Sequence, residues 1–196
     1  MRPPRVLHAP FGAGDAARLR MGDPVLLSGD IFTARDAAHE RLVSLLDAGR
    51  ALPVDLRGQI IYYCGPTPPR PGRPIGSAGP TTASRMDGFT PALLAYGIRG
   101  MIGKGRRSQA VREAIRRHRA VYFGAIEGTA ALLGERVREA VVVAFADLGA
   151  EAVYRLTVEE WPLIVVNDVA GRDVYEEGRA RYDRTACDGA GDKPRS

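Results

Sequence analysis

The chain has few residues that could bind a metal or form a disulfide framework. Its 196 residues include only two cysteines, Cys64 and Cys187. Cys64 lies in an apolar, strand-like run and Cys187 in a polar tail, so a disulfide is not indicated. The two cysteines also lack a C-x-x-C spacing, so we expect this chain's own residues to bind no metal cluster.

Long apolar runs are absent as well. No run approaches the roughly 20 residues that a transmembrane helix needs, so we expect no association with a membrane. The N-terminal segment MRPPRVLHAPFGAGD lacks the apolar region of a secretory signal. A cytoplasmic location is therefore the expectation.

The composition is typical of a soluble globular domain of ordinary size, with 45% hydrophobic and 26% charged residues. We expect one domain over residues 1–184 and a disordered polar tail over residues 185–196. The formal net charge of +5 admits nucleic acid, an acidic protein or an anionic substrate as partner. The basic cluster at residues 104–119 has no interleaved aromatic residues and matches no recognition helix, which favours the solvated face of a helix.

Strand-like and helix-like runs alternate through the middle of the chain. Apolar spacing predicts helices over residues 36–46, 83–96 and 108–118, with Thr81 or Thr82 capping the second and Ser108 the third. Between residues 65 and 80 lies a loop rich in proline and glycine, and so long an irregular segment indicates a function. Strands are expected at residues 24–28, 31–33, 59–64, 98–102, 120–123, 137–144, 152–158 and 163–168.

This alternation predicts an α/β fold with a parallel sheet, extended by further strands toward the C-terminus. Ligands of such folds bind beyond the carboxyl ends of the parallel strands. Arg35, Thr81, Arg85 and Lys104 all follow predicted strands, so we expect them at this edge of the sheet.

These residues suit a small anion with more than one charge. Arg35, Arg85 and Lys104 each lie near a predicted helix start, where unpaired N–H groups already favour anions. A dicarboxylate needs two separated cationic groups, and the planar fork of arginine matches a carboxylate bidentately. Thr81 lies four residues before Arg85, on the same face of the predicted helical turn.

A simpler interpretation assigns these residues to ordinary structure. Arg35 would then pair with Asp36 or Glu40 on the surface, and Arg85 with Asp87. Thr81 would be a helix N-cap.

Four segments resemble a known family over residues 26–174. They are SGDIFTARDAAHERL, YCGPTP, GPTTASRMDGFTPALLAYGIRGMIGKG and AVYFGAIEGTAALL. They are similar to the β subunit of class I, iron–sulfur-dependent fumarate hydratase and L-tartrate dehydratase, which in some members is the C-terminal domain of a longer chain. The resemblance implies a swivelling β/β/α domain of three layers with a central parallel sheet.

The resemblance also implies roles for single residues. Arg35 of the A-R-D-x-A-H motif, Arg85 of GPTTxxRMD and Lys104 would bind the substrate dicarboxylate. Thr81, the first threonine of GPTT, would be the catalytic base together with an aspartate from the other subunit or domain. His39 belongs to the first motif, but its role stays open between function and structure.

The implied reaction is the reversible hydration of fumarate to L-malate. The family's [4Fe–4S] cluster would be carried by a partner α subunit, in an assembly expected to be an α2β2 heterotetramer, and this chain alone would be inactive. L-tartrate or a mesaconate-type compound are alternative substrates. A non-catalytic anion-binding module, or a nucleic-acid-binding protein using residues 106–119, are alternatives of other classes.

Overall fold

The computed structural model describes residues 3–125 and 130–182. The tail expected at residues 185–196 and the second cysteine, Cys187, lie outside the described residues. No helix in the described ranges combines the length and the apolarity that crossing a bilayer requires.

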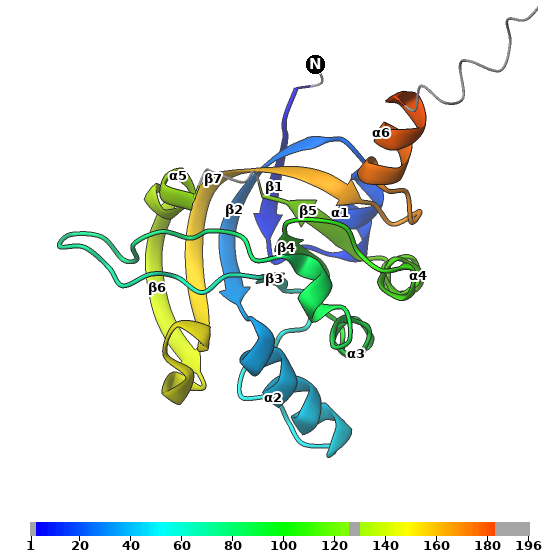
Figure 1. Ribbon diagram of the computed structural model, residues 1–196. Helices are drawn as coiled ribbons and strands as arrows, with labels where there is room; N and C mark the ends of the chain where they lie inside the picture. Colours follow the sequence, from blue (N-terminus) through cyan, green and yellow to red (C-terminus); the bar gives the residue numbers. More distant parts are fainter. Residues whose placement is uncertain (1–2, 126–129, 183–196) are drawn as a thin grey trace, which may run out of the picture.

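A seven-stranded sheet forms the body of the domain, in the order β1-β2-β3-β4-β5-β7-β6 (Figure 1). Strands β1 to β5 run parallel to their neighbours in this order, whereas β7 is antiparallel to both β5 and β6. The strands span Arg5–Ala9 (β1), Pro24–Thr33 (β2), Ile60–Tyr62 (β3), Gly100–Gly103 (β4), Val121–Gly124 (β5), Val137–Ala144 (β6) and Val153–Asn167 (β7).

The long strand β7 also pairs antiparallel with β2 and thereby closes β2, β3, β4, β5 and β7 into a ring. Apolar side chains fill this ring, and Trp161 is fully buried among them. The Trp161 ring packs edge-on against Tyr62 with centroids 4.8 Å apart, and its Nε1–H donates to the carbonyl oxygen of Leu133 at 2.8 Å. Burial of a large ring with a satisfied N–H stabilises this first core.

Three helices cover the outer face of β3, β4 and β5 (Figure 1). They are α2 (Asp36–Asp47), α3 (Thr90–Tyr96) and α4 (Gln109–His118). A second apolar core, which includes Leu42, Leu93 and Ile115, lies between these helices and the sheet. Two β layers and one helical layer confirm the expected three-layer β/β/α fold, with antiparallel strands added to the parallel ones.

Several predicted elements are confirmed near their predicted bounds, among them α2, α4 and β6. Ser108 caps α4 as predicted, because its hydroxyl accepts the N–H of Val111 at 3.4 Å. Two predicted pairs of strands are instead single strands, β2 and β7. In β2 the register shifts at Gly29, where φ is +107° and a Cβ would lie 2.3 Å from the carbonyl oxygen of Ala9.

The single helix predicted over residues 83–96 is wrong. The structure has a 3-10 helix, η1 (Ala83–Met86), and after a turn the separate helix α3. Pro91 lies in the first turn of α3, where its missing N–H costs nothing but where a preceding helical turn would clash. Thr82 occupies the N-cap position of η1, without a capping bond from its side chain, and Thr81 precedes it.

The remaining elements were not predicted. They are the strand β1 and the helices α1 (Ala13–Arg18), α5 (Ala130–Glu135), η2 (Ala146–Glu151) and α6 (Val174–Tyr182). The helices α1, α5 and η2 have six residues each, too few for a clear helical period.

Candidate functional site

Backbone hydrogen bonds join the segments that follow β2, β3 and β4. The N–H of Ala34 donates to the carbonyl oxygen of Tyr62 at 3.1 Å, and that of Thr81 donates to Tyr63 at 2.7 Å. Lys104 donates its N–H to Thr81 at 3.2 Å, and Thr82 and Lys104 form a parallel bridge. The predicted site residues therefore follow the carboxyl ends of neighbouring parallel strands, as expected.

Arg35 and Arg85 meet at one carboxylate, that of Asp36. Arg85 forms a bidentate pair with it, Nε to Oδ1 at 3.0 Å and Nη2 to Oδ2 at 2.9 Å. The Nε of Arg35 lies 3.9 Å from the same Oδ2. The two nitrogens that approach Oδ2 cannot be further apart than these two distances added together. The structure thus brings both forks together.

The guanidinium of Arg35 is only partly satisfied. Arg35 occupies the N-cap position of α2, and its side chain is 25% exposed. Its Nη2 lies 3.6 Å from a carboxylate oxygen of Glu151. Its Nε is buried and finds no hydrogen-bond partner among the residues the structure describes. Gly65 makes room for it, because a Cβ there would lie 3.1 Å from Nη1. A buried N–H without an acceptor is energetically unfavourable, so an acceptor atom of a ligand would be bound most favourably by such a donor.

Thr81 and Lys104 lie side by side at the next strand ends. The glycine before Lys104 allows this approach, since a Cβ on Gly103 would lie 2.8 Å from Cδ2 of Tyr63. Within the described part of the chain, the hydroxyl of Thr81 makes no hydrogen bond. Lys104 lines a pocket of about 570 Å³ whose other walls are mostly small or apolar residues, including Ile164 and Val166. The other predicted site residues, Arg35, Thr81 and Arg85, are not among those that line this pocket.

His39 is buried behind Arg35 and is a structural residue by its contacts. Its Nδ1–H donates to the carbonyl oxygen of Arg35 at 2.9 Å, and its ring packs edge-on against Tyr63. Its Nε2 is buried and unpartnered within the described residues. Burial lowers the pKa of His39 to about 4, so the ring is neutral near pH 7.

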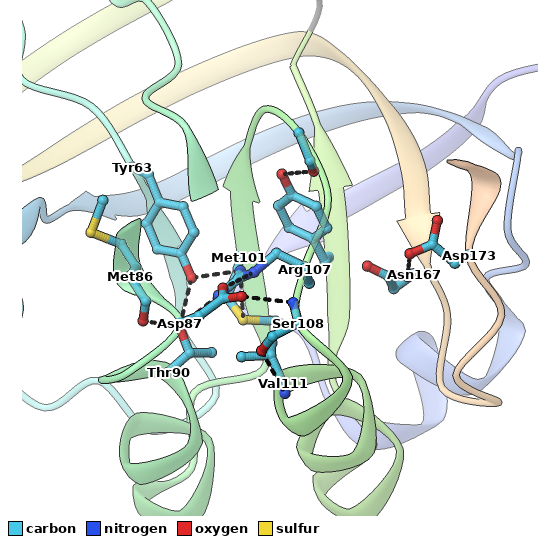
Figure 2. Close-up of polar contacts among 12 residues, drawn as sticks. Tyr63, Met86, Asp87, Thr90, Met101, Arg107, Ser108, Val111, Asn167 and Asp173 are labelled. Carbon is cyan, nitrogen blue, oxygen red and sulfur yellow. Dashed lines mark hydrogen bonds and ion pairs between the residues drawn. The ribbon is translucent and has the colours of Figure 1, made fainter. Parts of the chain in front are cut away.

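Arg107, a residue that the sequence did not single out, forms a buried cluster with Tyr63, Asp87 and Thr90 (Figure 2). Its side chain is fully buried, and its Nε pairs with Oδ1 of Asp87 at 2.7 Å. Its other nitrogens donate to the hydroxyls of Tyr63 at 2.9 Å and Thr90 at 2.7 Å. The guanidinium also lies over the rings of Tyr63 and Tyr122, 5.2 and 5.0 Å from their centroids.

The Arg107 cluster ties the segment of Arg85 to that of Lys104. Asp87, two residues after Arg85, accepts from Arg107 and also from the backbone N–H of Ser108 at 2.6 Å. The basic cluster at residues 104–119 is therefore not wholly a solvated face, because one member is a core residue. Nothing in the local sequence distinguishes Arg107 from its exposed neighbours, since its partners come from other elements.

The alternative prediction, that Arg35 and Arg85 form ordinary surface ion pairs, is confirmed in part. Arg35 does approach Asp36, but Arg85 also pairs with Asp36, whereas Asp87 pairs with Arg107. One carboxylate therefore serves two cations at the rim of the sheet. The nitrogens of Arg35 and Arg85 that do not contact Asp36 are the groups available to a ligand.

The described residues do not fit an iron–sulfur cluster. They contain no group of three or more His, Cys, Asp or Glu that could hold a metal ion. Cys64 lies inside the strand ring, and burial raises the pKa of its thiol to about 12. A cluster ligand must be a thiolate in an accessible position, which Cys64 is not.

Comparison with known proteins identifies relatives over most of the chain. The family model described as "Fumarase C-terminus" matches residues 7–178. The anaerobic class I fumarate hydratase of Escherichia coli is 40% identical over 153 residues, which are 77% of this chain and 28% of the relative. Fumarate hydratase 2 of Leishmania major is 37% identical over 159 residues, 80% of this chain and 28% of the relative.

A relative of similar length is found in Methanocaldococcus jannaschii. Its name, L(+)-tartrate dehydratase subunit beta, is provisional, and it is 37% identical over 169 residues, 83% of this chain and 87% of the relative. The chain thus spans little more than a quarter of the fumarate hydratases but nearly all of this subunit.

Proposed function

Since the chain belongs to the family of fumarase C-terminal domains, we propose that it is the dicarboxylate-binding part of a hydro-lyase. The proposed reaction is the reversible hydration of fumarate to L-malate. The observation that carries this proposal is the convergence of Arg35 and Arg85 on one carboxylate at the rim that also holds Thr81 and Lys104. Two arginine forks at one rim suit a molecule with a carboxylate at each end.

In this proposal Arg35 and Arg85 each bind one carboxylate of the substrate. Arg85 presents one edge of its guanidinium to Asp36 through Nε and Nη2, so Nη1 and the opposite edge face an incoming ligand. Lys104 adds a point charge beside the pocket. Binding both ends fixes the carbon between them relative to Thr81, which is the orientation effect that catalysis needs.

Thr81 is the proposed base, and Oγ1 is the atom that would accept the proton from the substrate carbon. A threonine hydroxyl is a poor base because its pKa lies far above neutrality. Nearby cations favour its alkoxide, and a carboxylate from the rest of the enzyme would take over the proton. The hydroxyl has no competing hydrogen bond within the described residues, which supports this role.

The [4Fe–4S] cluster of the family would have to be bound by another part of the enzyme, because the residues that the structure describes do not fit it. We propose that a separate α subunit carries it, in an α2β2 assembly. The near-complete match to a relative named as a subunit supports a separate chain, whereas the match to little more than a quarter of the longer fumarate hydratases is compatible with both parts in one chain.

The same match supports L-tartrate dehydration as a second candidate function. The reaction is of the same class. Residues of the α subunit would contribute to the choice between the two substrates.

The test is reconstitution with the α subunit under anaerobic conditions. Activity is measured on fumarate, L-malate, both tartrates and mesaconate, for the complex and for each subunit alone. We expect turnover of fumarate by the complex and none by this chain alone. Turnover of L-tartrate without fumarate would favour the second candidate, and a cluster-loaded complex inactive on the whole panel would contradict the proposal.

A further inference from the structure

Residues 65–80, which join β3 to η1, form a two-legged arm that projects from the body of the domain (Figure 1). The arm contains no helix or strand, and residues 67–73 are all exposed. A loop of this length inside a compact domain is uncommon and is usually functional. The core of the domain does not use its tip.

The two legs of the arm are held together near its middle. The N–H of Thr67 donates to the carbonyl oxygen of Ser77 at 3.1 Å, and that of Gly76 donates back to Thr67 at 3.0 Å. The hydroxyl of Thr67 also accepts the N–H of Ser77 at 2.7 Å. A Cβ on Gly76 would lie 2.2 Å from that hydroxyl, so the close approach of the legs requires glycine here.

The root of the arm is anchored to the body. Ile75 and Ala78 are buried in the first core, and the N–H of Ala78 donates to Ala130 of α5 at 3.0 Å. The arm and α5 approach so closely that a Cβ on Gly134 would lie 2.4 Å from the carbonyl oxygen of Gly76. The fixed root therefore holds an exposed tip in a defined direction.

Proline makes the tip stiff. Six of the sixteen residues are proline, at positions 66, 68, 69, 71, 74 and 80. Each proline fixes its own φ and restricts the residue before it. A segment ordered in this way before binding loses less conformational entropy when a partner covers it.

The tip carries positive charge only. Residues 65–80 include Arg70 and Arg73 but no aspartate or glutamate. Arg73 lies 3.6 Å from Glu135 of α5 and is half exposed, whereas Arg70 is exposed. Such a tip is complementary to an acidic surface and would speed association with it.

The position of the arm identifies the kind of partner. The arm leaves the site after β3 and returns to it at Thr81, so a protein that closes over Thr81 must also pass the arm. We infer that the arm is the docking element for the cluster-bearing α subunit, and that its arginines contact an acidic surface of that subunit. This inference rests on the proposed function, in which the α subunit completes the site.

The experiment compares two double charge reversals in the full chain. Arg70→Glu/Arg73→Glu changes the arm, and Arg116→Glu/Arg117→Glu changes two exposed arginines of α4 as a matched control. The Kd for the purified α subunit is measured at low and at physiological salt, together with the thermal unfolding midpoint of the free chain. A third variant shortens the arm by replacing residues 68–74 with Asn-Gly, which favours a tight two-residue turn.

We expect the arm reversal to raise the Kd at least about 10-fold at low salt, and the control less than about 2-fold. Because the only ion pair that the reversal breaks is the exposed one between Arg73 and Glu135 of α5, the unfolding midpoint should fall only slightly. The shortened arm should weaken binding at least as much.

Other outcomes separate this inference from the proposed function. Failure of the wild-type chain to bind the α subunit at all would contradict the proposed function itself. Wild-type binding that neither arm variant weakens would overturn the docking role alone. Loss of self-association in the arm variants, with α binding intact, would identify a second copy of this chain as the occupant and also overturn the inference.

Discussion

The buried Arg107 and the two rim arginines, Arg35 and Arg85, are satisfied very differently by their partners. Arg107 is fully buried, and it donates to Asp87, Tyr63 and Thr90. At the rim, Arg35 and Arg85 are 25% and 51% exposed and share the carboxylate of Asp36.

We propose that the difference separates a structural cation from ligand-binding ones. A buried charge persists only when hydrogen bonds and an opposite charge compensate for its lost hydration, and Arg107 has both. Arg35 has a buried Nε without a partner in the described part of the chain, and Arg85 has a free edge. An anion that enters the rim would complete these contacts, whereas nothing remains for it to complete around Arg107.

The largest loss in the free energy of unfolding is expected when the Arg107 cluster is disrupted. Arg107→Met keeps an unbranched side chain, shorter than that of arginine, and leaves the carboxylate of Asp87 without its cation. Removing one partner of a buried pair costs about 3–5 kcal/mol. The free energy of unfolding in urea should fall by this amount.

The matched variant at the rim is Arg85→Met. Because an exposed pair contributes at most about 1 kcal/mol, it should leave the free energy of unfolding nearly unchanged. Equal losses in both variants would remove the distinction between the two groups.

Catalysis should respond in the opposite order, and Arg85→Lys is the sharpest test. Lysine keeps the charge but loses the fork, so KM should rise and kcat should fall in the assembled enzyme. Loss of a charge-assisted contact to a buried carboxylate costs about 2–4 kcal/mol, a decrease in kcat/KM of roughly 30- to 1000-fold.

Arg41 provides the control for this change. It is an exposed arginine of α2 with a bidentate pair to Asp147, at 2.8 and 2.6 Å, and it lies outside the rim. Arg41→Lys should leave both kinetic constants unchanged. Unaltered kinetics in Arg85→Lys as well would exclude Arg85 from the site.

The rim was predictable from the sequence, and the buried group was not. Arg35, Arg85 and Lys104 each follow a local strand signal, and parallel strands bring their carboxyl ends to one edge whatever the details of the fold. Arg107 lies among similar arginines in the run GKGRRSQAVREAIRRHR. Its burial depends on Asp87, Tyr63 and Thr90, which tertiary packing brings to it.

The same reasoning explains the errors in secondary structure. Periodic segments such as α2 and β6 were predicted near their bounds, because their apolar spacing is a local property. Two features of β7 favour an interruption of the strand. Glu160 has a φ of +45°, and Pro162 lacks an N–H. Pairing with β2 on one side nevertheless carries the strand through both residues.

His39 contacts both the rim and the Arg107 cluster. Its titration tests whether a neutral His39 joins the two. Its Nδ1–H bonds the carbonyl oxygen of Arg35, while its ring packs on Tyr63, whose hydroxyl belongs to the Arg107 cluster. Its pKa is about 4 in the folded chain, compared with 6.5 for an ordinary histidine. The unfolded chain therefore binds the proton first as the pH falls.

This difference fixes the sign of the pH dependence. The contribution of the neutral ring to stability is complete above pH 6.5, decreases as the pH falls, and is lost by about pH 4. The total change attributable to His39 is about 3 kcal/mol. In His39→Asn the side-chain amide can still donate to Arg35 but does not titrate, so urea unfolding of this variant at pH 7, 6 and 5 should lack that decline. Parallel curves for the wild type and the variant would show that the buried group and the rim are not joined through a neutral His39.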